Sequence, residues 1–278
     1  MKIALCLFGS VGSKLKPERN VNNYLDPEIC FKSIKEYLID KFDTDIFFHT
    51  WSSNYNQKLI KIYKPKNYII EKPINFEPEL SKYSLKYINC YDDISKLIYN
   101  GQNPEEFYKN LSYRARSRWH SQSKVLYILK KYKERKKINY DFIIQSRFDL
   151  VINKSLDLKN LNKKKFYLVK KNKQSSNSLY DIFFVSNFIN ALKLSEIKKK
   201  IFRLPIDPSQ ALYFFFKKKG IKYSNYFDYK DIILFRYHVR RNNFIKKFIF
   251  LSIFYPLNLV YLLMGKIHKL INKFLNDE

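Results

Sequence analysis

Near the middle of the chain the sequence reads Tyr140-Asp141-Phe142-Ile143-Ile144-Gln145-Ser146-Arg147-Phe148-Asp149-Leu150. Its short apolar run between polar residues is typical of a strand buried in a parallel sheet. Arg147 and Asp149 follow this run two residues apart, so in extended chain they lie on one face. Ligands of open α/β sheets bind at the carboxyl ends of the strands. The stretch therefore predicts either a local ion pair or a site where Asp149 holds a divalent cation and Arg147 meets phosphate oxygens.

The composition favours a globular α/β protein with a strong positive charge. The 278 residues fit one large domain or a domain with an appendage, and the 46% of hydrophobic residues supply a core. Lysine and arginine number 53 against 25 acidic residues, and the net charge of +28 would attract nucleic acid, anionic lipid or phosphorylated small molecules. The basic residues are spread along the chain and form no nucleic-acid-binding motif. We therefore attribute the charge to a biased composition and a membrane-facing surface, and expect no nucleic acid as a partner.

The cysteines and the first residues indicate a cytoplasmic protein. Cys6, Cys30 and Cys90 lie far apart without metal-ligand spacing, which is typical of unpaired thiols in a reducing compartment. The apolar run after Met1-Lys2 spans only about six residues, which is too short for a signal peptide.

The sequence predicts a first buried strand over residues 3–8, followed by a turn of small residues at 9–13. Small residues there, beginning with Gly9 and Ser10, would let the backbone approach a ligand and would leave amides for phosphate or ribose. The turn is neither a Walker loop nor a complete dinucleotide-binding fingerprint. A tight structural turn is the alternative interpretation.

A second strand is expected over residues 45–48, and it too ends in polar and aromatic residues, His49-Thr50-Trp51-Ser52. His49 is either a ligand contact or a core histidine. Trp51 either stacks on a base or caps the core. A third strand is expected over residues 67–71.

A long helix is predicted to begin near Pro104 and to lead into the central strand. Just before the apolar face of this helix, next to a helix start, Arg114, Arg116 and Arg118 form either an anion site or a solvated basic turn. A later helix begins at Asp207-Pro208, because a capping Asp precedes Pro at the first helical position. Further strands are expected over residues 165–169, 180–185, 221–227 and 231–235.

The C-terminal part of the chain has a different character. Residues 248–264 carry no charge and are flanked by lysines. A spanning helix needs about 20 apolar residues, and Pro256 and Asn258 interrupt this run. We therefore expect a segment that lies in the interface of an anionic membrane, with a pair of core helices or a spanning helix as alternatives. The predicted domains are 1–240 and a basic, apolar helical tail over 241–278.

The order of motifs in the chain resembles one family. A Gly-containing turn follows the first strand, and an Asp-aromatic-His-Thr-Trp segment runs from Asp45 to Trp51 through the second strand. Ser-x-x-Lys then runs from Ser121 to Lys124, and Tyr-Asp-x-Ile-x-x-Arg-Phe-Asp and Asp-x-Phe-x-x-Ser come after it. Over roughly residues 1–240, this order resembles that of bacterial glycosyltransferases of surface-polysaccharide loci with a GT-A-like fold.

The resemblance implies a fold and an activity, and the predicted tail adds a location. The fold would be a single GT-A-like, Rossmann-like mixed α/β sheet flanked by helices, with a C-terminal amphipathic helical tail. The activity would be metal-assisted transfer of a sugar from a nucleoside-diphosphate donor, a nucleotide sugar, to a surface-polysaccharide or lipid-linked glycan acceptor, as in capsule or lipopolysaccharide synthesis. The enzyme would be peripheral on the anionic inner face of the cytoplasmic membrane.

The resemblance also implies roles for particular residues. Asp149 would hold Mn²⁺ or Mg²⁺ on the donor diphosphate, and His238, at the end of a late strand, would be a further ligand. If the reaction inverts, a carboxylate must take the acceptor proton, and the catalytic candidates are Asp181 and then Asp207. Relatives open the late helix with Pro-Glu where this chain has Asp207-Pro208-Ser209-Gln210, which leaves the base open. The other candidates are the donor or phosphate contacts Gly9, Ser10, Lys124 and Arg147, and the substrate contacts His49, Trp51, Gln122 and Gln210.

Two other classes of function remain open. The same metal site could serve phosphoryl or sugar-phosphate transfer. A non-catalytic basic protein that binds a membrane surface or nucleic acid would also carry this charge.

Overall fold

The computed structural model describes residues 1–11, 27–76, 104–170 and 177–235. Met1–Leu234 forms one compact unit. The second unit, Phe235–Glu278, lies outside the described residues beyond Phe235. The predicted membrane tail and His238 therefore fall outside the described residues as well.

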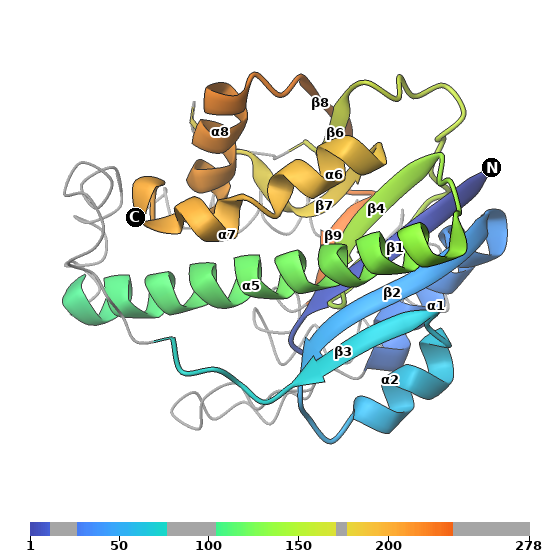
Figure 1. Ribbon diagram of the computed structural model, residues 1–278, viewed down its shortest axis with the longest axis horizontal. Helices are drawn as coiled ribbons and strands as arrows, with labels where there is room; N and C mark the ends of the chain where they lie inside the picture. Colours follow the sequence, from blue (N-terminus) through green and yellow to red (C-terminus); the bar gives the residue numbers. More distant parts are fainter. Residues whose placement is uncertain (12–26, 77–103, 171–176, 236–278) are drawn as a thin grey trace, which may run out of the picture. The chain divides into compact units, whose positions relative to one another are not determined.

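The described residues form an α/β fold, and the elements predicted within them are present (Figure 1). The strands are β1 (Lys2–Gly9), β2 (Asp43–Trp51), β3 (Asn67–Glu71), β4 (Phe142–Arg147), β5 (Leu150–Ile152), β6 (Phe166–Val169), β7 (Tyr180–Ser186), β8 (Tyr223–Phe227) and β9 (Ile232–Leu234). The α-helices are α1 (Pro27–Tyr37), α2 (Asn56–Tyr63), α5 (Pro104–Lys136), α6 (Phe188–Leu194), α7 (Ile197–Lys200) and α8 (Pro208–Lys219). Two short 3₁₀ helices are η2 (Ile39–Lys41) and η4 (Ile201–Arg203).

The main sheet has seven strands in the order β3-β2-β1-β4-β7-β6-β8. Strands β1 to β4 are parallel, whereas β7 runs antiparallel to both of its neighbours and β8 runs parallel to β6. The half formed by β3, β2, β1 and β4 has the strand order of a doubly wound nucleotide-binding sheet. The prediction of a mixed α/β sheet flanked by helices is confirmed.

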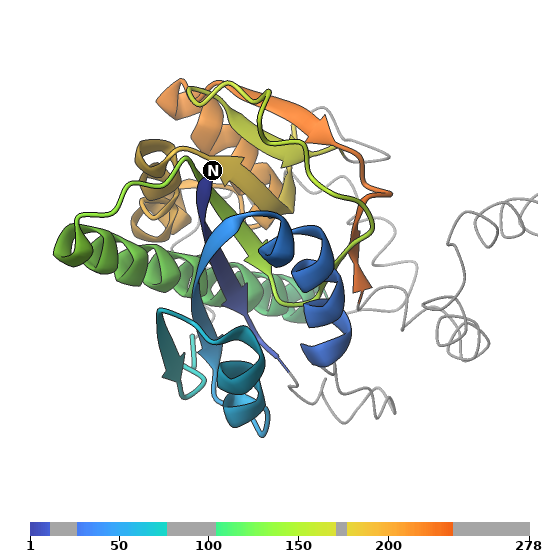
Figure 2. The same ribbon diagram turned by 90° about the vertical axis from the view of Figure 1, so that its right-hand side faces the viewer.

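Two hydrophobic cores lie on opposite faces of this sheet, because neighbouring residues of a strand point to opposite sides. On β1, Leu5 and Leu7 pack into the core shared with α1 and α2, whereas Cys6 and Phe8 pack into the core shared with α5, α6 and α8. Figure 2 shows α1 and α2 on one side of the sheet and α5 on the other. The face covered by α5 carries the candidate site.

The start of α8 follows the predicted capping chemistry. Asp207 is the N-cap, its side chain accepts a hydrogen bond from the amide of Gln210, and Pro208 occupies the first turn. Gly220 ends the helix in the left-handed conformation, with φ of 60°, which glycine adopts at little cost. Asn187 caps α6 in the same way as Asp207 caps α8.

The strands predicted from the sequence do not include one directly after Asp149. In the structure β5 follows there and pairs with β9 in a separate antiparallel sheet of two strands. Three residues are too few to show a strand period. The partner Ile232 lies far along the chain, so no local pattern reveals the pairing.

The sheet places several predicted site residues at one edge. The strand order reverses between β1 and β4, and ligands of open α/β sheets bind in the crevice outside the carboxyl ends at such a point. Phe8 pairs with Arg147 there. Because β7 is antiparallel and Phe183 faces Ser146, Asp181 enters the sheet at this same edge. Among the described residues, no helix has the length and apolar content needed to cross a membrane.

Candidate functional site

Arg147 and Asp149, the pair that ends the central strand, are joined by two hydrogen bonds. Arg147 Nε donates to Asp149 Oδ1 and Nη2 donates to Oδ2, each at 2.7 Å. Asp149 is only 3% exposed. A planar guanidinium matches a carboxylate in this two-pronged way, which lysine cannot do. The ion pair that the sequence offered as one alternative is therefore present. It lies at the switch point of the sheet, where the other alternative, a site for a cation and phosphate, would also lie.

A second ion pair joins α5 to the start of β7. Arg118 Nε lies 2.6 Å from Asp181 Oδ2, and Arg118 Nη2 donates to the Asp181 carbonyl oxygen. Ser209, in the first turn of α8, donates to Asp181 Oδ1 at 3.3 Å. Burial lowers the pKa of Arg118 to about 10, while the charge of Asp181 acts in the opposite direction.

These two pairs form one group, the arginine–aspartate cluster, made of Arg118, Arg147, Asp149 and Asp181. Arg147 and Asp149 both lie close enough to Arg118 to act on its pKa, the first lowering it and the second raising it. Two arginines balance two aspartates, so the cluster carries no net charge while all four groups are ionised. Arg118 Nη1 is buried and has no hydrogen-bond partner among the described residues. That orphaned N–H is a donor that a bound anion could satisfy.

The turn after β1 does not leave its first amide to a ligand. Gly9 has φ of 110°, a conformation that favours glycine, and its N–H donates to Ser121 Oγ at 2.9 Å. The expectation that this amide is unpaired for phosphate is therefore wrong. Ser121 supplies the partner because α5 passes over the end of β1. Ser10 is half-buried beside this turn.

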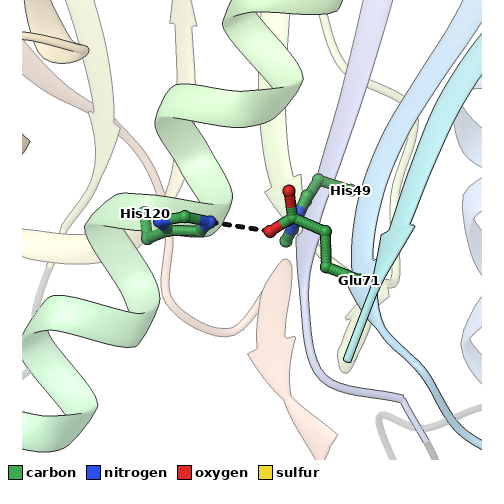
Figure 3. Close-up of side chains that lie close together, drawn as sticks. All are labelled: His49, Glu71 and His120. Atoms are coloured by element: carbon green, nitrogen blue, oxygen red, sulfur yellow. Dashed lines mark hydrogen bonds and ion pairs between the residues drawn. The ribbon is translucent and has the colours of Figure 1, made fainter. Parts of the chain in front are cut away.

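A second cluster of polar side chains lies where β2 and β3 end and α5 passes over them (Figure 3). Glu71 Oε2 lies 2.8 Å from His120 Nε2 and 3.2 Å from His49 Nε2. Lys124 Nζ donates to the other oxygen of Glu71, Oε1, at 2.6 Å. We call these four residues the histidine–glutamate cluster. His120 and Lys124 lie on one face of α5 because they are four positions apart.

Burial and charge set the protonation of this cluster. Burial lowers the pKa of His49 to about 4, although Glu71 opposes the shift. Burial also lowers the pKa of His120. Burial alone would raise the pKa of Glu71, but hydrogen bonds from Lys124, His120 and His49 outweigh it and lower this pKa to about 2. At neutral pH the two imidazoles are therefore uncharged, and Glu71 is a carboxylate.

Among the described residues, His49, Glu71 and His120 are the group whose ligand atoms could jointly hold a metal ion, since those atoms lie within 4.8 Å of one another. At the arginine–aspartate cluster, Asp149 is a hard oxygen ligand, as Mn²⁺ and Mg²⁺ prefer. A carboxylate oxygen has two lone pairs, so hydrogen bonds from Arg147 do not by themselves exhaust either oxygen of Asp149. Asp149 thus fits the predicted role but would supply only one or two ligands.

The other substrate-contact candidates lie in distinct surroundings. Trp51 is buried and stacks on His120, with ring centroids 5.4 Å apart and planes 24° apart, so it packs against the histidine–glutamate cluster. Gln122, on α5, donates to Oε1 of Gln145, on the central strand β4, at 2.7 Å. Gln122 Oε1 and Gln145 Nε2 have no hydrogen-bond partner among the described residues. Gln210 lies in the first turn of α8, where its backbone N–H donates to Oδ1 of the N-cap residue Asp207.

The structure separates candidates that the sequence had grouped together. Lys124, which like Arg147 was predicted to contact the donor or its phosphates, binds Glu71 on β3. β3 and β4 lie three strand spacings apart, about 14 Å. Arg147 and Asp149 bind each other and act electrostatically on Arg118, the partner of Asp181, whereas the side chain of Asp207 caps α8.

Two members of the two clusters, Glu71 and His120, were not assigned a role from the sequence, and Arg118 was predicted only as part of either an anion site or a solvated basic turn. Glu71 ends a predicted parallel strand, which places it at the same edge as His49. His120 and Lys124 have helical i,i+4 spacing, and Arg118 is one of the three alternating arginines. These signals existed, but the fold was needed to show which neighbour each side chain meets.

Comparisons with known proteins give only distant structural similarity. No protein-family model and no curated protein sequence matches the chain. A cytidylyltransferase from Leptospira borgpetersenii serovar Hardjo-bovis is similar over 82% of this chain and 76% of its own, with 14% identity and a TM-score of 0.37. A nucleoside-diphosphate-sugar pyrophosphorylase from Vibrio cholerae is similar over 84% of this chain and 95% of its own, with 9% identity and a TM-score of 0.36. Mouse xyloside xylosyltransferase 1 is similar over 81% of this chain and 84% of its own, with 8% identity and a TM-score of 0.33. These identities and TM-scores are too low for any function to be carried over to this chain.

Proposed function

We propose that this protein is a glycosyltransferase that moves a sugar from a nucleoside-diphosphate donor to a glycan or lipid-linked acceptor. The observation that carries the proposal is the arginine–aspartate cluster at the switch point between β1 and β4. Two guanidinium groups and two carboxylates from α5, β7 and the end of β4 meet there. Crevices at such points are where open α/β sheets bind nucleotides.

The cluster suits a reaction in which a diphosphate leaves. When the bond between the sugar and the diphosphate breaks, negative charge builds on the leaving oxygens. Arg118 is held rigidly by burial and by Asp181, and Arg147 is held by Asp149. Donors fixed in advance stabilise such charge at little cost in reorganisation. The orphaned Nη1 of Arg118 supports a phosphate oxygen as its partner.

Asp149 would hold the divalent ion of the resemblance, Mn²⁺ or Mg²⁺. Such an ion, when bound, supplies Lewis-acid stabilisation of the leaving diphosphate. Arg147 orients the Asp149 carboxylate through its two hydrogen bonds, so a ligand role for Asp149 would depend on Arg147.

If the reaction inverts, Asp181 is the better candidate for the base. Arg118 and Ser209 hold its two oxygens in place at the edge of the sheet. Asp207 instead uses a carboxylate oxygen to cap α8. An oriented carboxylate on the face of the sugar opposite the leaving diphosphate can accept the acceptor's proton, and Asp181 would have to face that side of the bound sugar.

We further propose that the enzyme works at the inner membrane surface, in the synthesis of a surface polysaccharide such as capsule or lipopolysaccharide. The support is the uncharged, lysine-flanked run over 248–264 in the sequence. Aromatic and aliphatic side chains would enter the headgroup region while the lysines meet anionic lipid. A lipid-linked acceptor lies at that same surface.

A donor screen tests the activity. The full-length protein is incubated with a panel of nucleoside-diphosphate sugars and Mn²⁺, and release of nucleoside diphosphate is measured. Donors labelled in the sugar or in the β-phosphate then show which part reaches the acceptor. Transfer of the sugar alone supports the proposal. Transfer of labelled phosphate would show phosphoryl or sugar-phosphate transfer instead, and turnover of no donor would contradict the proposal.

A further inference from the structure

We propose that His49, Glu71 and His120 form a binding site for a transition-metal ion of the Zn²⁺ type. The three side chains come from β2, β3 and α5 and point toward one another (Figure 3). Their ligand atoms all lie within 4.8 Å of one another. The proposal is independent of the proposed transferase activity, because it rests on other residues at another part of the sheet edge.

The spacing of the ligand atoms is close to that of a metal site. Zinc takes imidazole nitrogen and carboxylate oxygen at roughly 2.0 to 2.2 Å, so tetrahedral ligands lie about 3.4 Å apart. Glu71 Oε2 lies 2.8 Å from His120 Nε2 and 3.2 Å from His49 Nε2. Both distances are within about 0.6 Å of that spacing, so a small shift of the Glu71 carboxylate would make room for the ion.

The hydrogen bonds of Ser121 can fix the tautomer of His49 that a metal ligand requires. His49 Nδ1 lies 2.7 Å from Ser121 Oγ, and that hydroxyl can donate to the His49 carbonyl oxygen at 3.3 Å. In this arrangement Nδ1 carries the hydrogen and Nε2 presents a lone pair toward Glu71. A lone pair that faces a carboxylate is unfavourable until a cation lies between them. Orientation of a histidine ligand through its second nitrogen is a general feature of metal sites.

Glu71 is held in a matching way. Lys124 donates to Oε1 at 2.6 Å, which turns the other oxygen, Oε2, toward both imidazoles. His49 is fully buried, and Trp51 stacks on His120, so the imidazoles have little freedom to turn away. A preformed set of ligands binds with a smaller ordering cost.

The type of ligand selects the type of metal. Two imidazoles and one carboxylate are typical of zinc sites that leave a position open for water or substrate. Mg²⁺ and Ca²⁺ instead require oxygen ligands and gain from carboxylate charge. Lys124 and Lys198 act electrostatically on this cluster, so its surroundings are positive and oppose any cation. A bound ion must therefore gain its affinity from the two imidazoles, which suit Zn²⁺ better than Mg²⁺ or Ca²⁺. The site is therefore distinct from the Mn²⁺ or Mg²⁺ role proposed for Asp149.

The same side chains also permit an arrangement without metal. If the hydroxyl of Ser121 donates to His49 Nδ1, then Nε2 carries the hydrogen and donates to Glu71. The cluster would then be a hydrogen-bonded tie between α5 and the sheet. Metal binding and this alternative predict different results in one experiment.

The experiment is a titration of metal-free, full-length protein with Co²⁺, whose visible absorption reports ligand type and coordination number. We expect one Co²⁺ per chain, a spectrum of low coordination number with nitrogen ligands, displacement by Zn²⁺ and no displacement by excess Mg²⁺. Absence of saturable binding, or displacement by Mg²⁺, would overturn the proposal.

Variants locate the site among the 4 histidines of the chain. His120→Gln and Glu71→Gln should each weaken Co²⁺ binding by about tenfold or more. Even changes in residues that only hydrogen-bond to a metal ligand lower metal affinity by about tenfold or more. His268→Gln is the matched control and should bind Co²⁺ as the unmodified protein does. His238→Gln and Asp149→Asn test whether the ion binds instead at the separate site proposed for Mn²⁺ or Mg²⁺. Binding that follows His238 or His268 instead would overturn the proposal.

A measurement on the unmodified protein covers the case in which a variant fails to fold. With ¹⁵N-labelled histidine, Zn²⁺ should shift the ring nitrogen signals of two imidazoles, and the unmetallated nitrogen of one should remain protonated toward Ser121. Unchanged imidazole signals at saturating Zn²⁺ would show the hydrogen-bonded tie and would reject the metal site.

Discussion

The Arg147 guanidinium donates two parallel hydrogen bonds of 2.7 Å to the carboxylate of Asp149, from Nε to Oδ1 and from Nη2 to Oδ2. This geometry needs a planar fork, so Arg147→Lys keeps the charge but loses one prong. We expect kcat/KM for the donor to fall by about tenfold or more, with the folded structure retained. Steady-state kinetics and circular dichroism would check this. An Arg147→Lys enzyme with unchanged kcat/KM would show that the fork does not serve catalysis.

Asp149→Asn removes the charge that is proposed to hold the divalent ion and to orient Arg147. Turnover should fall by about 100-fold or more, the size of loss seen when one preorganised group of an active site is removed. Asp43→Asn is a matched control, because Asp43 starts β2 at the opposite edge of the sheet and pairs with Lys2 on the surface. Equal losses in both variants would point to a general effect of charge or folding.

The pair of Arg118 and Asp181 should contribute to folding as well as to catalysis. Their side chains are 8% and 14% exposed, so removal of one partner leaves the other charge nearly buried. Asp181→Asn or Arg118→Met should each lower the free energy of unfolding by about 3 kcal/mol or more, whereas the double variant should lose less than the sum of the two. Urea unfolding of the four proteins measures this coupling.

Kinetics separate the second role of Asp181. If it faces the sugar or the acceptor, Asp181→Asn should lower kcat more than it raises the donor's KM. Parallel losses in donor affinity and rate would make Asp181 a binding or structural residue.

Asp207 should act as a helix cap, and two substitutions distinguish this role from that of a base. Asp207→Ala should lower the free energy of unfolding by about 1 kcal/mol, and Asp207→Ser should restore most of it, because serine also caps. Asn187→Ala, at the cap of α6, is the matched comparison. Loss of turnover in an Asp207→Ser protein of normal stability would instead support Asp207 as the base.

The sequence predicted the sheet elements well because their signals are local. Apolar runs marked β1, β2 and β4, and the Asp207-Pro208 pair marked the start of α8. The direction of β7 was not predicted, since an antiparallel strand has the same apolar pattern as a parallel one when both faces are buried. β5 was missed for a different reason: it has only three residues, and its partner, β9, lies far away in the sequence.

The candidate site was predicted only in part. Arg147 and Asp149 could be found because two residues on one strand have a fixed relation. The partners of Asp181 and of Lys124 come from elements far apart in sequence, and burial decides which charges must pair. The free amide expected at Gly9 was wrong because α5 supplies Ser121, a partner that the turn itself does not reveal.

Deletion of residues 243–278 tests the proposed membrane tail. The shortened protein should move from the membrane to the soluble fraction, since lysines near an anionic surface contribute about 1 kcal/mol each and would be lost. Donor hydrolysis should be retained, whereas transfer to a membrane-borne acceptor should fall. Fractionation and both assays check this. An insoluble or unfolded product would show that the tail belongs to the core.

Lys124→Gln should tighten binding of Co²⁺ to the histidine–glutamate cluster. Lys124 donates to Glu71 Oε1 at 2.6 Å, and a glutamine N–H can replace that bond without the charge. Repulsion between an ammonium and a divalent ion about 6 Å away weakens binding by about 1.4 kcal/mol even in a water-like dielectric. Removal of the Lys124 charge should therefore raise the affinity for Co²⁺ by about tenfold. Lys130→Gln, which removes a surface charge paired with Glu134 on the same helix, should leave the affinity unchanged. Weaker binding in Lys124→Gln alone would mean that Lys124 serves the site by orienting Glu71, and that this orientation outweighs the repulsion between its charge and the ion.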